Sequence, residues 1–133
     1  MKKVLTFVMV GVLMLTCSMG IYAAAPETII PLWDNIYSMP MSFSFDGTNG
    51  TVSASVTGKS GVTTISGTLT IYEKTSTGWR YVSSDSDTVE ARSMTLSVSF
   101  TGVANVEYKA VFDVSVTRNG VVEPETKTVY KTC

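Results

Sequence analysis

From residue 42 onward, apolar and polar residues alternate with a period of two, in runs separated by Gly, Asn, Asp and Ser. This alternation is typical of β-strands with one buried face, and nothing beyond residue 25 shows a helical period. Runs of this length and spacing predict an all-β domain, an antiparallel sandwich of about seven strands, with an antiparallel barrel as the alternative. The expected strands lie within 33–45, 51–57, 63–73, 79–83, 94–100, 106–117 and 121–130.

Two aromatic residues refine the sandwich prediction. Trp79 lies in the short fourth run, and Tyr108 precedes Ala110 by two residues. An immunoglobulin core packs a middle-strand Trp against a disulfide and has a Tyr two residues before the second Cys, a place that Ala110 takes here. We therefore predict an immunoglobulin-like sandwich that lacks this disulfide and buries Trp79 near Tyr108.

Asn119-Gly120 predicts a tight type I′ hairpin, because both central residues of that turn need a positive φ. A strict two-residue loop would place Val116 opposite Glu123 and Phe112 opposite Lys127, which mixes core positions with charge. We therefore expect a bulge within 123–125, on a strand at the edge of the sheet, where Pro124 costs no ladder hydrogen bond.

The first residues have the order of a secretory signal: Lys2 and Lys3, an apolar run over 4–15, and small residues over 23–25. The apolar run has about twelve residues, whereas a membrane-spanning helix needs about twenty, so a permanent anchor is the weaker interpretation. A lipid anchor on Cys17 is a further alternative, but no small residue precedes that cysteine. The expected organisation is a signal-peptide helix over 1–23, an extended segment over 24–41 and the sandwich over 42–133.

Cleavage after residue 23 would leave eight basic and eleven acidic residues, a net charge of −3. Binding to nucleic acid or to an anionic membrane needs clustered Lys and Arg, so we expect neither after cleavage. Cys133 would be the one remaining cysteine, which excludes an internal disulfide. We expect it on a mobile, exposed tail, where it could form a disulfide-linked dimer.

The chain contains no His, which removes Ser-His-Asp and Cys-His catalysis and the commonest zinc or copper ligand. Asp85-Ser86-Asp87, followed by Glu90, is the main acidic cluster. Asp85 and Asp87 point the same way in an extended loop and could share a hard cation such as calcium, but the spacing matches no complete calcium loop. A solvated loop is the simpler interpretation, and we expect no cofactor.

Several aromatic residues do not fit the inward alternation and could form a platform for a sugar. Tyr72 falls on the outward face of its strand, and Tyr81 shares a face with Trp79. Trp33, Tyr37 and Tyr130 are further candidates. Ordinary decoration of a sheet surface is the alternative for all of them.

Segments spread over most of the chain carry a resemblance: GKSG at 58–61, ISGTLTIY at 65–72, Trp79, FTG at 100–102, EYKA at 107–110 and NGVVE at 119–123. In these the chain resembles short, exported, uncharacterised bacterial proteins that are themselves similar to immunoglobulin-like and fibronectin type III modules. The segments are mainly core and turn positions. The resemblance implies a bacterial, extracellular β-sandwich and brings no catalytic residue with it.

Together these features predict a secreted or surface-associated, non-catalytic module that binds a protein or glycan or serves a structural role. The binding candidates are Tyr72, Tyr81, Asp85 and Asp87. The alternative is a small extracellular glycan hydrolase that uses carboxylates. No sortase-type tail follows the domain, so we expect release into the medium.

Overall fold

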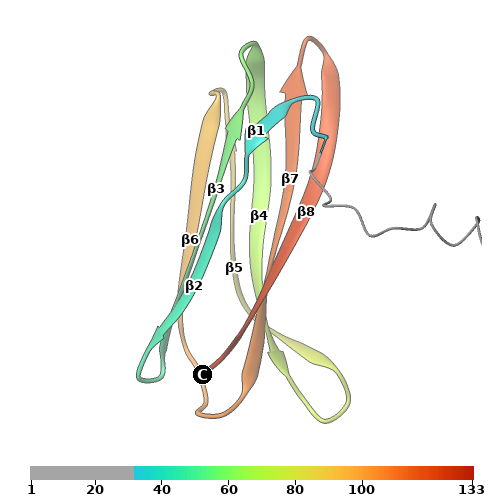
Figure 1. Ribbon diagram of the computed structural model, residues 1–133. Coiled ribbons are helices and arrows are strands. Elements are labelled where there is room, and N and C mark those ends of the chain that lie inside the picture. Colours follow the sequence, from blue (N-terminus) through green and yellow to red (C-terminus); the bar gives the residue numbers. More distant parts are fainter. Residues whose placement is uncertain (1–31) are drawn as a thin grey trace, which may run out of the picture. The chain divides into compact units, whose positions relative to one another are not determined.

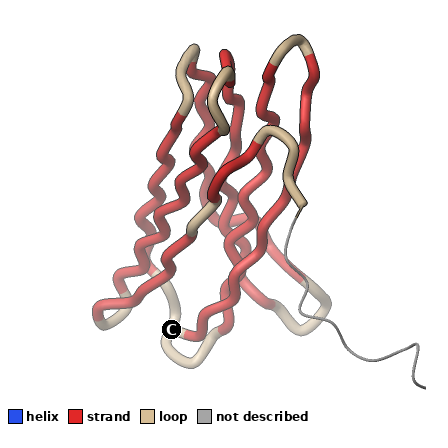
Figure 2. Tube along the Cα trace, turned by 45° about the horizontal axis from the view of Figure 1, so that its top comes forward, coloured by secondary structure: helices blue, strands red, loops and turns tan. Residues whose placement is uncertain are grey.

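The computed structural model describes residues 32–133, in which every regular element is a β-strand (Figure 2). No helix in this range could span a membrane. The strands are β1 (Ile36–Ser38), β2 (Met41–Asp46), β3 (Asn49–Gly58), β4 (Val62–Lys74), β5 (Trp79–Val89), β6 (Ser93–Thr101), β7 (Glu107–Arg118) and β8 (Val121–Thr132). The expected signal peptide over 1–23 and Cys17 lie outside the described residues.

The strands form two antiparallel sheets that lie face to face (Figure 1). In the first sheet, β3 pairs with β6 on one side and with β1 and β2 on the other. The second sheet has the order β5-β4-β7-β8. The prediction of an all-β antiparallel domain is confirmed, and the strands form two sheets instead of one closed barrel. The additional strand, β1, lies in the segment that was expected to lead into the domain.

The core lies between the sheets and consists of the alternate residues that the two-residue period predicts. Leu69 and Phe112, which face each other across β4 and β7, are fully buried. Burial of side chains of this size stabilises the fold by about 1.5–3 kcal/mol each. Gly67 interrupts the row because a Cβ there would lie 2.4 Å from Cε of Met94 in the opposite sheet. A side chain at this position would therefore collide with the opposite sheet.

Tyr108 belongs to the core, but Trp79 does not. Tyr108 is 1% exposed and packs against Phe45 and Phe100, with ring centroids 5.6 and 5.1 Å away. Trp79 is half-buried and lies opposite Lys74 in the β4–β5 ladder. A bulge in β5 breaks the alternation, because Ser83 faces Ile71 while Tyr81 faces Tyr72. The prediction that Trp79 is a core residue beside Tyr108 is therefore wrong.

The β7–β8 hairpin turns at Asn119 and Gly120, which have φ of +52° and +75°, so the predicted turn is confirmed. The predicted bulge is wrong, since the register runs unbroken from Arg118↔Val121 to Glu107↔Thr132. Hydrogen-bonded and non-hydrogen-bonded pairs alternate along such a ladder. Counted from the turn, Pro124 falls in a non-hydrogen-bonded pair, and its nitrogen points away from β7.

The strict register turns charged residues of β8 toward the core side, and they bond to the chain segment 33–39 of the other sheet. The carboxylate of Glu123 accepts the backbone N–H groups of Asp34, Asn35 and Ile36 at 2.7, 3.2 and 3.3 Å. The core side tolerates this charge because the carboxylate replaces water as the acceptor for backbone donors.

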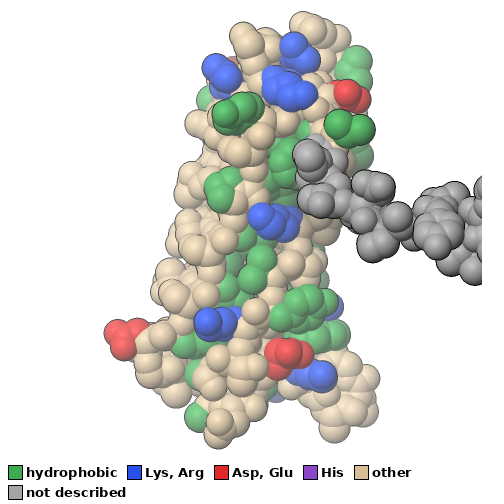
Figure 3. Space-filling model, viewed as in Figure 1, with side chains coloured by type: hydrophobic (Ala, Val, Ile, Leu, Met, Phe, Trp, Pro, Cys, Tyr) green, Lys and Arg blue, Asp and Glu red, His purple; other side chains and the backbone are tan. Residues whose placement is uncertain are grey.

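Two further side chains of β8 extend this contact along the open side between the sheets. Glu125 accepts the indole N–H of Trp33 at 2.9 Å, and the ammonium of Lys127 donates to the carbonyl of Met39 at 3.0 Å. Figure 3 shows a basic side chain among hydrophobic ones along this side of the molecule. We call Glu123, Glu125 and Lys127 the β8 clamp. Inward charges of this kind also protect an edge strand from pairing with other chains.

The strand β5 is longer than the expected run over 79–83 and includes the acidic cluster that we expected in a loop. Asp85 lies opposite Leu69 and Asp87 opposite Gly67, so both carboxylates are on the core-facing side of the strand. Both are exposed, because β5 is the other edge of its sheet. Both edges of this sheet thus direct charge inward.

Cys133 is not on a mobile, exposed tail. Its backbone N–H donates to the carbonyl of Val106, and its carbonyl accepts the N–H of Asn105, both at 3.0 Å. The side chain is half-buried, and its sulfur lies 3.7 Å from the carbonyl oxygen of Gly47. The expectation fails because β8 continues to Thr132 and the loop after β6 holds the last residue.

Replacing Glu123 with Ala should lower the free energy of unfolding by about 1–3 kcal/mol, because backbone donors of residues 34–36 lose their acceptor. Glu123→Gln keeps one acceptor oxygen and should lose less. Urea unfolding followed by circular dichroism measures both changes. Glu90→Ala, in the exposed turn after β5, serves as the control and should stay within about 0.5 kcal/mol of the parent. An Ala variant as stable as the parent protein would contradict this role of the β8 clamp.

Candidate functional site

A cluster of aromatic and basic side chains lies on the outer face of the β5-β4-β7-β8 sheet. Tyr72, Lys109 and Tyr130 stand in one row across β4, β7 and β8, each between residues that face the core or its edge. Trp79 of β5 joins them, with its ring centroid 5.9 Å from that of Tyr130. We call Tyr72, Trp79, Lys109 and Tyr130 the aromatic cluster.

Trp79 reaches the cluster from the far edge of the sheet. In a flat sheet of this order, β5 and β8 would be separated by three strand spacings, or about 14 Å. The ring contact between Trp79 and Tyr130 is much shorter than this. Figure 1 shows the β4–β5 hairpin bent away from the body of the sheet. The indole of Trp79 lies near Lys109 of the middle strand β7, with 4.6 Å between the ammonium and the ring centroid.

Lys109 is the centre of the aromatic cluster. Its ammonium lies 4.6 Å from the ring centroid of Trp79 and 5.1 Å from that of Tyr72. Contacts of a cation with ring faces at these distances contribute about 0.5–1 kcal/mol at exposed sites. Tyr130 remains 56% exposed, whereas the other three members are half-buried. Contacts among its members and with the sheet thus hold the cluster in place, while the exposed ring of Tyr130 is accessible from solvent.

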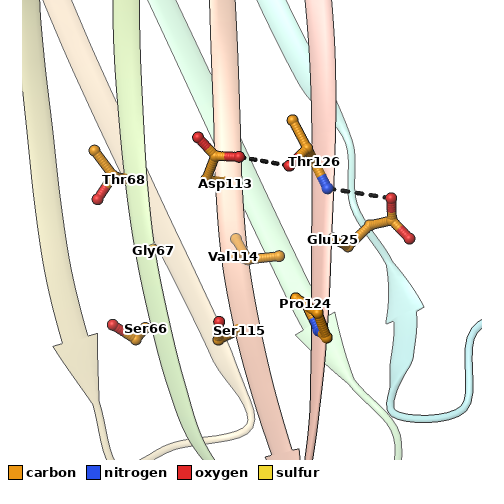
Figure 4. A pocket seen from close by; sticks show the side chains of 9 residues that line it. All are labelled: Ser66, Gly67, Thr68, Asp113, Val114, Ser115, Pro124, Glu125 and Thr126. Atoms are coloured by element: carbon orange, nitrogen blue, oxygen red, sulfur yellow. Dashed lines mark hydrogen bonds between the residues drawn. The ribbon is translucent and has the colours of Figure 1, made fainter.

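A shallow hollow of about 500 Å³ lies further along the same sheet, with a lining that includes small hydroxyl side chains and two carboxylates, those of Asp113 and Glu125. Thr68, Asp113 and Thr126 stand side by side on β4, β7 and β8, and the Thr126 hydroxyl donates to Asp113 (Figure 4). The lining residues are Ser66, Gly67, Thr68, Asp113, Val114, Ser115, Pro124, Glu125 and Thr126. We call this region the Asp113 hollow.

The aromatic cluster and the Asp113 hollow share the same strands. On β7, Lys109 and Asp113 are four positions apart, which corresponds to about 13 Å along a strand. Thr70 and Val111 lie between them, paired across β4 and β7. The outer face therefore offers one extended surface, apolar at one end and rich in hydroxyl groups at the other.

A second hollow, of about 400 Å³, is lined by Glu73, Arg80 and Tyr108 among others. Glu73 is buried, and its carboxylate is bound by the Arg80 guanidinium and by the Tyr108 hydroxyl at 3.1 Å. The Tyr108 oxygen also accepts the N–H of Val103 at 2.8 Å. The Glu73 carboxylate and the Tyr108 hydroxyl thus both have hydrogen-bond partners. The arrangement joins the β4–β5 hairpin to the loop after β6, and we assign it a structural role.

The structure separates the binding candidates of the sequence analysis. Tyr72 belongs to the aromatic cluster. Tyr81 lies opposite Tyr72 across β4 and β5, is 58% exposed, and its hydroxyl is 3.0 Å from that of Ser84. Tyr81 also lines the hollow beside Glu73 and makes no ring contact with the aromatic cluster among the described residues.

Asp85 and Asp87 lie on β5, on the side opposite to the aromatic cluster. Asp87 accepts the backbone N–H of Thr88 at 2.8 Å. Within residues 32–133, no group of three or more Asp, Glu, His or Cys side chains is close enough to hold a metal ion. Asp85 and Asp87 therefore have no third Asp, Glu, His or Cys side chain close enough to complete a calcium site with them in that range.

Lys109 was not among the predicted binding residues, although the alternation along β7 indicates that its side chain points outward. Lys109 lies between Tyr108 and Ala110, which were both expected to face inward, so its outward position was predictable. Its position beside Tyr72 was not, since it depends on the pairing of two strands about forty residues apart in the chain. Asp113 was missed for the same reason.

Neither protein-family models nor curated protein sequences match this chain. Among solved structures it is similar to the sporulation control protein Spo0M from Bacillus subtilis, at 14% identity and a TM-score of 0.40. That match covers 74% of this chain and 49% of Spo0M, so the chain spans about half the length of that protein. A protein from Archaeoglobus fulgidus matches at 12% identity and a TM-score of 0.34, over 74% of this chain and 97% of that one.

Replacing Tyr108 with Phe should cost about 1–3 kcal/mol of unfolding free energy, because Glu73 loses a donor and Val103 an acceptor. Burial is the main cause that raises the pKa of Tyr108 above its ordinary value of 10.0, which favours the neutral phenol in the folded state. Its contribution is therefore complete below pH 10 and is lost as the pH rises from there through the higher folded pKa.

Urea unfolding between pH 8 and about 11 measures this difference. The gap in stability between the parent protein and Tyr108→Phe should narrow above pH 10. Tyr37→Phe, at a position on β1 that is 71% exposed, is the control and should leave the free energy of unfolding near its parent value. A gap that is small at neutral pH, or that widens in alkali, would contradict the buried hydrogen bond.

Proposed function

We propose that the protein is a non-catalytic module that binds a glycan on the outer face of the β5-β4-β7-β8 sheet. The aromatic cluster is the observation that carries this proposal. Three rings from three strands meet on the outer face, although an antiparallel sheet needs only polar decoration on that side. Exposed rings next to hydrogen-bonding groups are the surface that a sugar needs, because a pyranose has an apolar C–H face and a rim of hydroxyl groups.

The Asp113 hollow supports the choice of a glycan over a protein partner. Its polar lining side chains are four Ser and Thr hydroxyls and the carboxylates of Asp113 and Glu125, all of which can bond to sugar hydroxyls. The centre of a protein interface is usually richer in large apolar side chains. A glycan uses the rings and the hydroxyls together, along one face.

The fold that we propose is an immunoglobulin-like sandwich of the fibronectin type III kind. Two observations support it. In the first sheet β1 and β2 share one side of β3 and β6 lies on the other side. This sheet faces a second sheet with the order β5-β4-β7-β8. The Tyr108 hydroxyl, near the start of β7, also bonds to the backbone of Val103 five residues upstream. Immunoglobulin-like sandwiches have a tyrosine with this geometry at the same corner.

An extracellular location is part of the proposal and rests on the N-terminal sequence. Lys2 and Lys3, the apolar run and the small residues over 23–25 support export and cleavage. A disulfide-linked dimer through Cys133 belongs to the same proposal, because an exported chain with one thiol can pair only with another molecule. The ordered, half-buried position of that sulfur means that the last residues would have to move for the bond to form.

The enzyme alternative has less support. A hydrolase would need two carboxylates facing one cleft. Asp85 and Asp87 lie on an edge strand and face away from the aromatic cluster, and the sequence has no His to serve as a base. We therefore propose binding without turnover and test for turnover directly.

In a glycan array followed by titration calorimetry, the exported protein should bind at least one oligosaccharide. Tyr72→Ala and Tyr130→Ala should each weaken that binding about tenfold, which corresponds to about 1.4 kcal/mol. Tyr37→Ala is the control, since Tyr37 is an exposed tyrosine like Tyr130 but lies on β1 of the other sheet. It should bind like the parent protein.

Three results would contradict the proposal. These are a negative array, equal losses in all three variants, or hydrolysis of a bound glycan that Asp85→Ala abolishes. The last result would favour the enzyme alternative.

The exported product should begin at or near Ala24, as measured by mass spectrometry of the intact protein in the medium. Ala23 and Ala25 fit the small-x-small pattern of signal peptidase sites, but cleavage after Ala25 would leave Pro26 as the first residue, which is poorly processed, so we expect cleavage after Ala23. Ala23→Leu is the test variant and should slow processing or shift the cleavage site. A product that keeps Met1 and stays with the membrane would overturn the extracellular location.

A further inference from the structure

Lys109 is the basic residue of the outer face that has no acidic partner. The ion pairs among residues 32–133 join Lys74 to Glu107 at 3.6 Å and Arg80 to Glu73. The Lys109 ammonium instead has ring faces of Tyr72 and Trp79 as neighbours. The ammonium therefore lies in a half-buried, partly apolar setting with no carboxylate beside it.

This charge is the part of the aromatic cluster that a ligand can complete. Contact with the rings replaces only some of the water that the ammonium gives up, and the ammonium has three donors. A carboxylate brought in by a ligand would form a charge-assisted hydrogen bond there, and nearby rings would reduce its screening by water. A sugar that bears a carboxylate can do this while its ring lies against the exposed ring of Tyr130.

The other end of the surface has the opposite charge. Asp113 is exposed, accepts a hydrogen bond from Thr126, and has no basic partner among the described residues. A second acidic sugar about 13 Å from the first would meet this carboxylate and be repelled. Neutral sugar hydroxyls, in contrast, can donate hydrogen bonds to it.

We infer that the ligand is an oligosaccharide with a carboxylate-bearing sugar at one end and neutral sugars after it. The acidic sugar lies on the aromatic cluster with its carboxylate at Lys109, and the neutral sugars lie over the Asp113 hollow. This inference rests on the proposed glycan binding and adds the charge and the length of the ligand. It follows from the charges at the two ends of the outer face, since Lys109 attracts a carboxylate and Asp113 repels one.

Three probes of equal length test the inference by titration calorimetry on the exported protein. The first is a neutral glucose trisaccharide. The second is the same trisaccharide with glucuronic acid at its non-reducing end, so that the two differ by one carboxylate. The third is a triuronide, with a carboxylate on every sugar. We expect the second to bind at least tenfold more tightly than either of the others, with an affinity that falls as salt is added.

Two variants of Lys109 separate its charge from its packing. Lys109→Met keeps an unbranched side chain on the rings but removes the charge, and it should bind the neutral and the mono-acidic probe equally. Lys109→Arg keeps the charge and should retain the preference. Asp113→Asn removes the repulsion and should improve binding of the triuronide at least fivefold. Circular dichroism and thermal unfolding show whether each variant is folded.

The outcomes distinguish this inference from the proposed function. If the parent protein binds the neutral and the mono-acidic probe equally, the inference is wrong while glycan binding stands. If Lys109→Met keeps the preference for the acid, or Asp113→Asn leaves the triuronide unchanged, the assignment of the two ends is wrong. If Lys109→Met does not fold, the salt dependence of the parent protein and of Lys109→Arg decides, and affinity that is independent of salt overturns the inference. A glycan array with no binding would overturn the proposed function itself.

Discussion

The hydrogen bonds between β8 and the backbone of residues 33–39 hold together the open side of the two sheets. The core rows of β4 and β7 are apolar, but the row that β8 adds is charged, so this side cannot be closed by hydrophobic contact alone. The carboxylate of Glu123 joins the two sides instead, because it accepts hydrogen bonds from the backbone N–H groups of residues 34–36. Asn35 adds to this from the other direction, since its side-chain amide donates to the carbonyls of Val116 and Val121.

The same solution explains why the outer face of the second sheet is free for a ligand. Since the inward row of β8 carries the charges that protect the edge, its outward row can carry Tyr130 and Thr126. The opposite edge repeats the pattern with Asp85 and Asp87 directed inward. The acidic pair that looked like a site in the sequence is thus part of the way in which this sheet protects its edges.

Strand positions and the tight turn at 119–120 were predictable because both depend on residues close together in the chain. The errors arose where the outcome depends on distant partners. No local feature marks the bulge in β5 that turns Trp79 outward, and none shows that Glu123 has backbone donors from residues 34–36 in reach. For the candidate site, the outward position of Tyr72 was predictable from alternation. That Lys109 and Tyr130 lie beside Tyr72 was not predictable, because they come from strands whose order no sequence pattern reveals.

β1, near the start of the described residues, and the C-terminus lie toward opposite ends of the two sheets (Figure 1). Tension applied between β1 and the C-terminus would act largely along the strands and pull β8 lengthwise past β7. All twelve residue pairs of that ladder then share the load. If the strands were instead peeled apart, the pairs would open one after another. The β8 clamp, which joins the segment 33–39 to the same strand, lies directly in the path of the force. Tension on the chain would therefore load the β7–β8 ladder and the β8 clamp together.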